Sequence, residues 1–230
     1  MKGIVKESNQ WRIRPVYTVS QSAKLADVHP VTVRRWLYGS NTASTKMRPV
    51  FSGKDTKKED KAEVSFLQLA EIVVVSRFRQ RKVKLQTLRA AHEYARNELE
   101  LDYPFAWLHL KTDGVNVFSE FERSHPDASL LTLNKKGQLT LPGNVLKALE
   151  LFDYEEEFAA RWYPVGKNVP IVIDPRYGAG LPTIPKRRLT IAAIYNRWKS
   201  GESIRFISSD YALPQNVVET SLQYAENYVL

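Results

Sequence analysis

The chain has two groups of carboxylates that could bind a metal ion and cleave a phosphodiester bond. Glu155, Glu156 and Glu157 form an acidic run, and Asp174 precedes a proline. Metal-assisted hydrolysis needs carboxylates that converge from separate elements, whereas adjacent side chains in one loop diverge. We therefore interpret the acidic run as a solvated loop beside a strand.

Other residue types that carry catalysis are sparse. The sequence has no cysteine, which excludes disulfides, thiol nucleophiles and cysteine-bound zinc. His92 has no second histidine three or four residues away, so we interpret it as a packed helix residue; His109 and His125 are isolated, in an expected strand and loop. No nucleophile, base and carboxylate share a catalytic spacing. The sequence thus predicts a protein that is not an enzyme and needs no cofactor or metal.

The basic residues are the other candidates for a functional role, and they are unevenly distributed along the chain. The 230 residues have a formal net charge of +9, and 43% of them are hydrophobic, as in globular proteins. Residues 1–97 hold 20 Lys and Arg against 8 Asp and Glu, a net charge of +12. Residues 98–165 have a net charge of −6 (6 against 12) and residues 166–230 of +3 (8 against 5). A positive field attracts phosphate backbones, although it also serves solubility.

The N-terminus has no signal-peptide pattern, and no apolar run is long enough to span a bilayer. We therefore expect a cytoplasmic protein without a membrane contact.

Two helices are expected to position the basic residues of the N-terminal part of the chain, residues 1–97, which we call the head. Ser20 is the expected N-cap of a first helix at residues 21–27. Pro30 can open the second helix, because its missing N–H costs nothing at the first position, and Gly39 can end it. On this second helix Val33, Trp36 and Leu37 share one face.

That apolar face should pack on the first helix and leave a basic face outside. This is the helix-turn-helix layout, in which the second helix enters the DNA major groove. An ordinary helical hairpin with solvated arginines is the alternative. The outward residues are Val31, Arg34, Arg35 and Tyr38.

Residues 17–36 carry a resemblance to a known family. The string Tyr-Thr-Val-Ser-x-x-Ala-x-x-Ala-x-Val-x-Pro-x-Thr-Val-Arg-Arg-Trp resembles the opening of MerR-type winged helix-turn-helix domains. In those domains the second helix and a following β-wing both touch DNA, so we expect a wing around residues 46–51. The resemblance implies these DNA contacts: Val31, Thr32, Arg34, Arg35, Tyr38, Lys46 and Arg48.

Two helices are expected after the wing, at residues 64–79 and 85–98, as in the MerR-type domain. Five basic residues fall within eight positions between them. Positive charge near a helix C-terminus complements the helix dipole, and a contact with the DNA backbone or a partner is the other interpretation. The five are Arg77, Arg79, Arg81, Lys82 and Lys84.

The middle of the chain is predicted to be a small β-rich domain. Residues 105–121 alternate around a Thr-Asp-Gly turn at 112–114, which is typical of a β-hairpin. Residues 130–141 predict a second hairpin around residues 134–137. A short helix at 143–151 and strands at 158–163 and 169–173 should follow.

The C-terminal segment is predicted to form three short helices in a helix-turn-helix-like bundle. Thr190 is the expected N-cap of the first helix, and Gly201 ends it. The sequence therefore predicts an α+β chain with three domains: a winged helix-turn-helix at 1–100, a β-rich middle at 101–166 and a helical domain at 167–230.

The tail also has a specific pattern, Ile-x-x-Asp-Pro-x-x-x-x-Gly-x-Pro-x-Ile from residue 171, followed by Trp-x-x-Gly-Glu-Ser-Ile from residue 198. It resembles a small domain of formerly unknown function that is typical of VapB-type antitoxins. Family members often carry a Gly-Thr-Arg turn where this chain has Pro185-Lys186-Arg187-Arg188. A MerR-like head with this tail resembles the longer VapB antitoxins over most of the chain.

The resemblance implies an antitoxin of a type II toxin–antitoxin pair. Such a protein neutralises a VapC-like PIN-domain ribonuclease and, as a homodimer, represses its own operon. A basic segment could complement the carboxylate-lined site of the nuclease. Lys186, Arg187 and Arg188 are the candidates for this, although they could simply coat an exposed loop.

Two other functions are weighed against the antitoxin. One is a stand-alone MerR-like transcription regulator whose middle domain senses a ligand. The other is a metal-dependent nuclease that acts through Asp174 or the run at residues 155–157.

Overall fold

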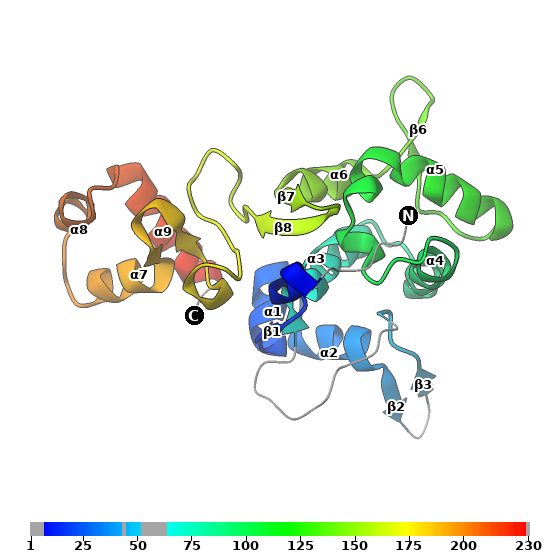
Figure 1. Ribbon diagram of the computed structural model, residues 1–230, viewed down its shortest axis with the longest axis horizontal. Helices are drawn as coiled ribbons and strands as arrows, with labels where there is room; N and C mark the ends of the chain where they lie inside the picture. Colours follow the sequence, from blue (N-terminus) through cyan, green and yellow to red (C-terminus); the bar gives the residue numbers. More distant parts are fainter. Residues whose placement is uncertain (1–6, 43–44, 52–63, 229–230) are drawn as a thin grey trace. The chain divides into compact units, whose positions relative to one another are not determined.

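The computed structural model describes residues 7–42, 45–51 and 64–228 (Figure 1). The chain divides into two compact units, Met1–Ala160 and Arg161–Leu230. The described residues form α-helices and short two-stranded sheets, so the predicted α+β class is confirmed. None of the helices in these residues is both long and apolar enough for a membrane span.

The helix-turn-helix consists of α1 (Val19–Ala26) and α2 (Pro30–Tyr38), after η1 (Glu7–Arg12) and β1 (Pro15–Tyr17). The N-cap of α1 is Thr18, so the prediction of Ser20 was wrong. The Thr18 hydroxyl accepts from the Gln21 N–H at 3.1 Å, and the Gln21 side chain accepts from the Thr18 N–H at 2.9 Å. This capping box satisfies two free N–H groups at once, which begins the helix two residues earlier.

A β-wing follows α2, but it lies earlier than predicted. Strands β2 (Ser40–Thr42) and β3 (Thr45–Met47) pair antiparallel, with Ser40 opposite Met47. Gly39 turns the chain with φ of +74°, and a Cβ there would lie 2.3 Å from the Met47 carbonyl oxygen. Residues 48–51 leave the wing because Val50 and Phe51 are buried.

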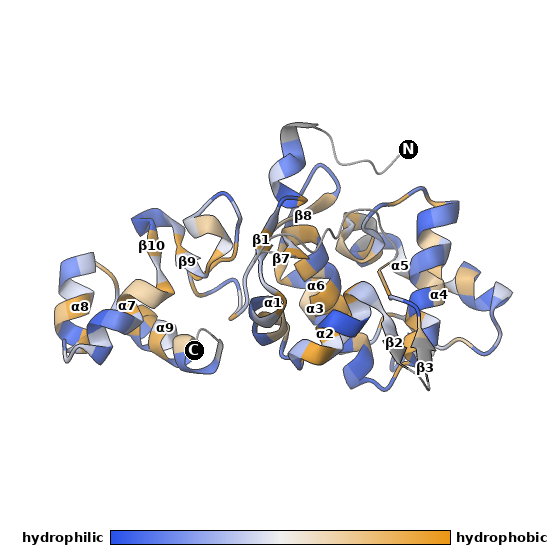
Figure 2. Cartoon of the chain, turned by 90° about the horizontal axis from the view of Figure 1, so that it is seen from below, coloured by the Kyte–Doolittle hydropathy of each residue, from blue (hydrophilic) through white to orange (hydrophobic). Residues whose placement is uncertain are grey.

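The centre of the first unit is α3 (Phe66–Gln80), which begins after β4 (Val64–Ser65) and is followed by α4 (Leu85–Glu98); both predicted helices are confirmed. Strand β4 pairs with β1. Helix α3 is buried on nearly all sides, packing against α1, η2 (Pro104–Ala106) and α6 (Gly143–Glu150). Figure 2 shows apolar residues concentrated on α3 and α6.

The first predicted hairpin of the middle segment is wrong. Residues 105–121 instead form most of η2 and α5 (Leu108–Ser124), which also places His109 on a helix. The buried residues recur with a helical spacing of three or four: Leu110, Gly114, Phe118 and Phe121. A Cβ at Gly114 would lie 3.2 Å from Leu110 Cδ1 and 3.3 Å from Leu141 Cδ1. The glycine therefore permits close packing here, which overrides its usual role in a turn.

The rest of the middle follows the prediction more closely. The second hairpin is present as β5 (Thr132–Leu133) and β6 (Leu139–Thr140), and α6 follows it. Strands β7 (Phe152–Glu155) and β8 (Phe158–Trp162) form a further sheet. The expected strand at residues 169–173 is reduced to single bridges, from Ile173 to Trp162 and from Val172 to Thr183.

The second unit contains the predicted three-helix bundle of α7 (Ile191–Lys199), α8 (Ile204–Tyr211) and α9 (Gln215–Tyr228). Thr190 is the N-cap of α7, as predicted, and its hydroxyl accepts from the Ala193 N–H at 3.3 Å. The chain enters the bundle through η3 (Gly178–Gly180), β9 (Thr183–Ile184), η4 (Pro185–Arg187) and β10 (Leu189–Thr190). The three domain limits from the sequence remain a prediction.

Candidate nucleic-acid interface

Helix α2 has the two faces that its sequence predicts. Val33, Trp36 and Leu37 are buried, and α2 packs against α1. Val31 is 48% exposed, and Arg34 and Arg35 are also exposed. Thr32 and Tyr38 are half-buried, with the Arg34 guanidinium 5.8 Å from the centroid of the Tyr38 ring. The structure thus brings these five predicted contacts together on one short helix.

The N-terminus of α2 is capped by a histidine. The His29 Nδ1 atom accepts from the Val31 N–H at 3.2 Å, and Pro30 occupies the first helical position. The first turn therefore has a fixed start, which orients Val31 on the outer face. In a helix-turn-helix protein the N-terminal residues of the second helix contact base edges.

The segment after the wing is attached to two helices at once. The Val50 and Phe51 N–H groups donate to the Trp36 carbonyl of α2, at 2.8 and 3.3 Å. From α4, Arg89 Nε donates to the Pro49 carbonyl at 2.8 Å, and its Nη2 donates to the Arg48 carbonyl at 2.7 Å. The end of the wing is therefore held in a fixed position relative to α2.

Of the two predicted wing contacts, the structure describes the side chain of Arg48 but not that of Lys46. Arg48 has a side chain that is 73% exposed, with its Nη1 atom 3.5 Å from Glu93 Oε1. Lys46 lies on β3 opposite Asn41, but its side chain is outside the described residues.

The environment of Arg89 also affects its charge equilibrium. Partial burial, and to a smaller degree the positive charge of Arg48, lower the pKa of Arg89.

The basic turn between α3 and α4 is exposed at Arg79, Arg81, Lys82 and Lys84. Arg79 Nη1 donates to the Val83 carbonyl at 2.5 Å, so this arginine stabilises the turn itself. The remaining cations of the turn are open to a phosphate or an acidic surface.

A buried carboxyl group that sequence reasoning missed, that of Glu71, lies between α3 and α4. Glu71 on α3 and His92 on α4 are each about 1% exposed. Glu71 Oε1 lies 3.1 Å from His92 Nε2 and accepts from the Phe105 N–H at 3.1 Å. His92 is therefore a packed helix residue, as predicted. The signal for Glu71 was its place within the apolar run of α3, where only a bonded carboxylate is tolerated.

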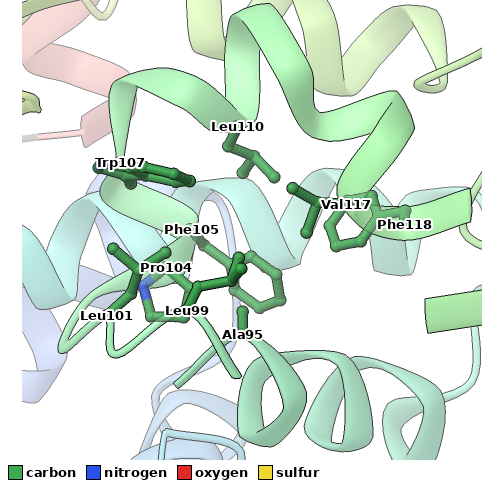
Figure 3. Close-up of a pocket in the computed structure, with 9 residues that line it drawn as sticks. All are labelled: Ala95, Leu99, Leu101, Pro104, Phe105, Trp107, Leu110, Val117 and Phe118. Atoms are coloured by element: carbon green, nitrogen blue, oxygen red, sulfur yellow. The ribbon is translucent and has the colours of Figure 1, made fainter. Parts of the chain in front are cut away.

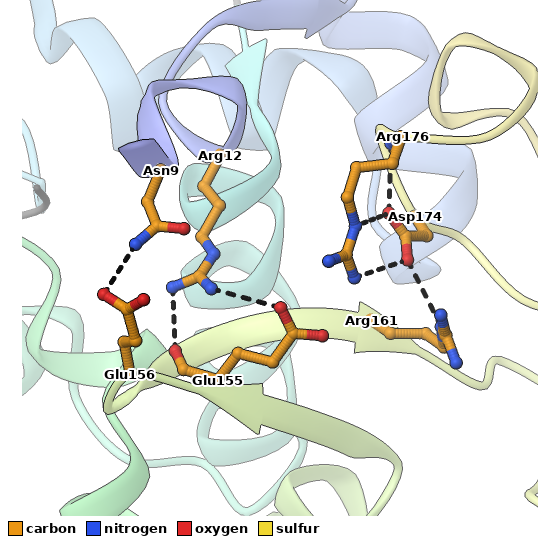
Figure 4. A network of polar contacts seen from close by, with 7 residues as sticks. All are labelled: Asn9, Arg12, Glu155, Glu156, Arg161, Asp174 and Arg176. Carbon is orange, nitrogen blue, oxygen red and sulfur yellow. Dashed lines mark hydrogen bonds and ion pairs between the residues drawn. The ribbon is translucent and has the colours of Figure 1, made fainter. Parts of the chain in front are cut away.

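Among the carboxylates that suggested a nuclease, those of Glu155 and Asp174 contact arginines and that of Glu156 contacts Asn9 (Figure 4). Within the first unit, Arg12 Nη1 donates to the Glu155 carbonyl at 2.8 Å, and Arg12 Nη2 lies 3.5 Å from Glu155 Oε2. Asn9 donates to Glu156 Oε2 at 2.8 Å. The acidic run lies in the β7–β8 turn and holds the N-terminal segment.

Asp174 of the second unit is 1% exposed and belongs to a separate network. It accepts from Arg161 Nε at 3.2 Å and from Arg176 Nη2 at 2.9 Å. Among the described residues, no group of three or more His, Asp or Glu could hold a metal ion. These contacts favour a structural role for both sets of carboxylates.

The predicted toxin-binding residues form an exposed, ordered turn. Lys186 and Arg187 end η4, and Arg188 has a left-handed conformation with φ of +50°. All three side chains are exposed. Arg187 Nη2 donates to the Ala212 carbonyl at 2.8 Å, which ties the turn to the junction of α8 and α9.

Comparison with known proteins places this geometry in context. Residues 15–92 match the family described as "Putative DNA-binding HTH domain", and residues 171–225 match "Protein of unknown function (DUF433)". The chain is 22% identical, over 90% of its length and 92% of the relative's, to a Mycobacterium tuberculosis protein named "Putative antitoxin VapB45".

The fold also has a solved counterpart. The X-ray crystal structure of Rv2018 from Mycobacterium tuberculosis superposes with a TM-score of 0.77 at 20% identity, covering 91% of this chain and 98% of that one. The predicted resemblance is thus confirmed: the head of the chain matches a family of helix-turn-helix DNA-binding domains, the tail matches DUF433, and the chain as a whole resembles a VapB-type antitoxin.

Proposed function

We propose that this protein is a DNA-binding antitoxin that neutralises a VapC-like PIN-domain ribonuclease and represses its own operon. The observation that carries the DNA-binding part of the proposal is the joint anchoring of α2 and the wing, through Trp36 and Arg89. The antitoxin part is supported by the similarity to the protein named "Putative antitoxin VapB45". That anchoring preorganises two DNA-contacting elements, as a repressor requires.

The proposed DNA surface is the outer face of α2 with the wing. Arginines can bond guanine edges bidentately or hold phosphates. The basic turn at residues 77–84 is a further candidate for a backbone contact. A homodimer is expected, because two half-sites in an operator match a two-fold axis. We place this function in the cytoplasm, where the operator lies. The proposed contacts are Val31, Thr32, Arg34, Arg35, Tyr38, Lys46 and Arg48.

For the toxin we propose a contact with Lys186, Arg187 and Arg188. Their exposure and the anchoring of Arg187 present three positive charges in a defined geometry. Such a turn complements a carboxylate-lined nuclease site. The protein itself is expected to act by binding and to catalyse no reaction.

The proposed function is tested by two binding measurements on the full chain. Anisotropy titrations with the DNA upstream of its own gene should show specific binding that weakens steeply with salt. The proposal predicts that a gene for a PIN-domain nuclease lies beside the gene of this protein, and co-expression of the two should give a stable complex that lacks ribonuclease activity. Failure of the full chain to bind that nuclease would contradict the antitoxin function, and failure to bind the DNA would contradict repression.

A second function, a regulator that senses a ligand, would need a cavity for that ligand. An apolar pocket lies between α4, η2 and α5, and its lining contains no charged residue (Figure 3). Its volume is about 10 Å³, which is room for a single water molecule and too small for an aromatic ligand such as indole or toluene. The pocket therefore does not favour a ligand-sensing function over the antitoxin. The lining residues are Ala95, Leu99, Leu101, Pro104, Phe105, Trp107, Leu110, Val117 and Phe118.

A further inference from the structure

The β5–β6 hairpin extends an apolar face beyond the core of the first unit. Leu133 lies directly opposite Leu139 in the register of the two strands. Leu131 and Leu141 are buried, but two residues further toward the tip Leu133 is 64% and Leu139 50% exposed. Since alternate residues of a strand share a face, the four leucines form one continuous apolar surface. Its outer half has no cover within the described chain.

Hydrogen bonds hold the hairpin at its tip and at its base. At the tip, Asn134 Oδ1 accepts from the N–H groups of Lys136 and Gln138, at 2.9 and 3.0 Å. At the base, Glu122 on α5 accepts from the N–H groups of Leu130 and Leu131. A surface that is already ordered loses little conformational entropy when it binds a partner.

The charge of the hairpin is entirely positive. Residues 130–146 contain Lys135 and Lys136 at the tip and no aspartate or glutamate. Both lysines are exposed. An acidic surface around an apolar cleft would complement the lysines and bury the leucines at the same time.

The position of the hairpin separates it from the proposed DNA surface. In Figure 1 the β5–β6 loop projects from the opposite side of the first unit to α2 and the β2–β3 wing. A duplex bound along α2 and the wing would leave the hairpin free. Paired leucines also gain nothing from a phosphate backbone, whereas they would gain free energy by burial in a protein cleft.

We propose that the β5–β6 hairpin is a docking site for an acidic protein, with Leu133 and Leu139 in an apolar cleft and Lys135 and Lys136 at its acidic rim. This inference rests on the proposed function, under which that protein is the toxin. It adds a contact in the first unit to the one proposed at residues 186–188.

The test is calorimetric titration of the neighbouring PIN-domain nuclease into full-length variants. We expect Leu133→Asp/Leu139→Asp, and separately Lys135→Glu/Lys136→Glu, to weaken nuclease binding by about tenfold or more. Operator affinity and melting temperature should change little, because all four side chains are exposed. Lys111→Glu/Lys147→Glu, which reverses two exposed lysines on α5 and α6, is the matched control and should bind as the wild type does.

Each other outcome has a distinct meaning. Wild-type affinity for the nuclease in both hairpin variants would overturn the inference and leave the antitoxin function standing. Unchanged nuclease binding with weaker DNA binding, or with a smaller oligomer in light scattering, would assign the hairpin to DNA or to a second copy instead. A wild-type chain that does not bind the nuclease would overturn both the inference and the proposed antitoxin function.

Discussion

The Nε atom of Arg89 on α4 lies 2.8 Å from the carbonyl oxygen of Pro49, and the same guanidinium reaches the carbonyl of Arg48 at 2.7 Å. The Arg89 guanidinium thus holds the backbone at the end of the wing, while the Arg48 side chain is 73% exposed and contacts Glu93 at 3.5 Å. Arg89 positions the wing, and Arg48 is the residue that we propose contacts DNA.

This division predicts different effects for Arg89→Met and Arg48→Ala. Arg89→Met should lower the free energy of unfolding by about 1–2 kcal/mol, because two charged hydrogen bonds are lost. It should weaken operator binding without changing the dependence on salt. Arg48→Ala should leave stability nearly unchanged and reduce the slope of log affinity against log salt by about 1. Urea unfolding would measure the stability of both variants, and anisotropy titrations at several salt concentrations would measure their operator affinity. Identical salt slopes in both variants would contradict the assignment of Arg48 as a DNA contact.

Arg35→Ala tests α2 as the recognition helix. Arg35 is exposed on the outer face, so the substitution should weaken operator binding by about 1–3 kcal/mol without a loss of stability. Arg14→Ala, at an exposed arginine before β1, is the control and should change affinity much less. An unchanged gel-shift titration of Arg35→Ala at fixed salt would show that α2 does not read DNA.

The position of Val31 predicts that the protein prefers thymine at one position of each operator half-site. It is an apolar side chain, 48% exposed, in the first turn of α2, where it can contact a thymine methyl group in the major groove. Replacing thymine by deoxyuridine at each operator position should weaken wild-type binding at one position of each half-site. Val31→Ser, which replaces the apolar side chain by a polar one, should bind both versions of the DNA equally. If deoxyuridine at every position leaves the affinity of the wild type unchanged, Val31 does not contact a thymine methyl group.

Glu71→Ala should destabilise the first unit. The substitution leaves the buried Phe105 N–H without its acceptor and His92 Nε2 without its partner. Loss of such buried bonds costs about 3 kcal/mol in total. Urea unfolding would measure this, with Glu120→Ala on the exposed face of α5 as the control. Equal stability of the two variants would mean that the Glu71 contacts contribute nothing net.

Local patterns predicted much of the helix-turn-helix and the tail. The sequence correctly predicted three features of α2, because each depends only on that helix and its ends. They are the buried face of Val33, Trp36 and Leu37, the start at Pro30 and the end at Gly39. The same holds for Thr190 at the start of α7. Ser20 was chosen wrongly because Thr18 offers a competing cap, and its advantage comes from a second partner, Gln21.

The α5 segment shows where local patterns mislead. Thr112, Asp113 and Gly114 favour a turn in isolation, and residues 115–121 suit a strand as well as a helix. The helix is favoured by tertiary packing: Leu141, which is 27 residues after Gly114, packs so closely that its Cδ1 would lie 3.3 Å from a Cβ at residue 114. The nuclease hypothesis met a similar limit, since only the fold brings Arg12 to Glu155.

The basic head, the amphipathic α2 and the resemblance to VapB-type antitoxins follow from residue order, because that order sets charge, helical faces and caps. The folded chain was needed to show that Arg89 holds the wing, that Glu71 and His92 are buried together, and that Leu133 and Leu139 are exposed. Burial and partners depend on contacts between residues far apart in the chain, and no local pattern encodes them.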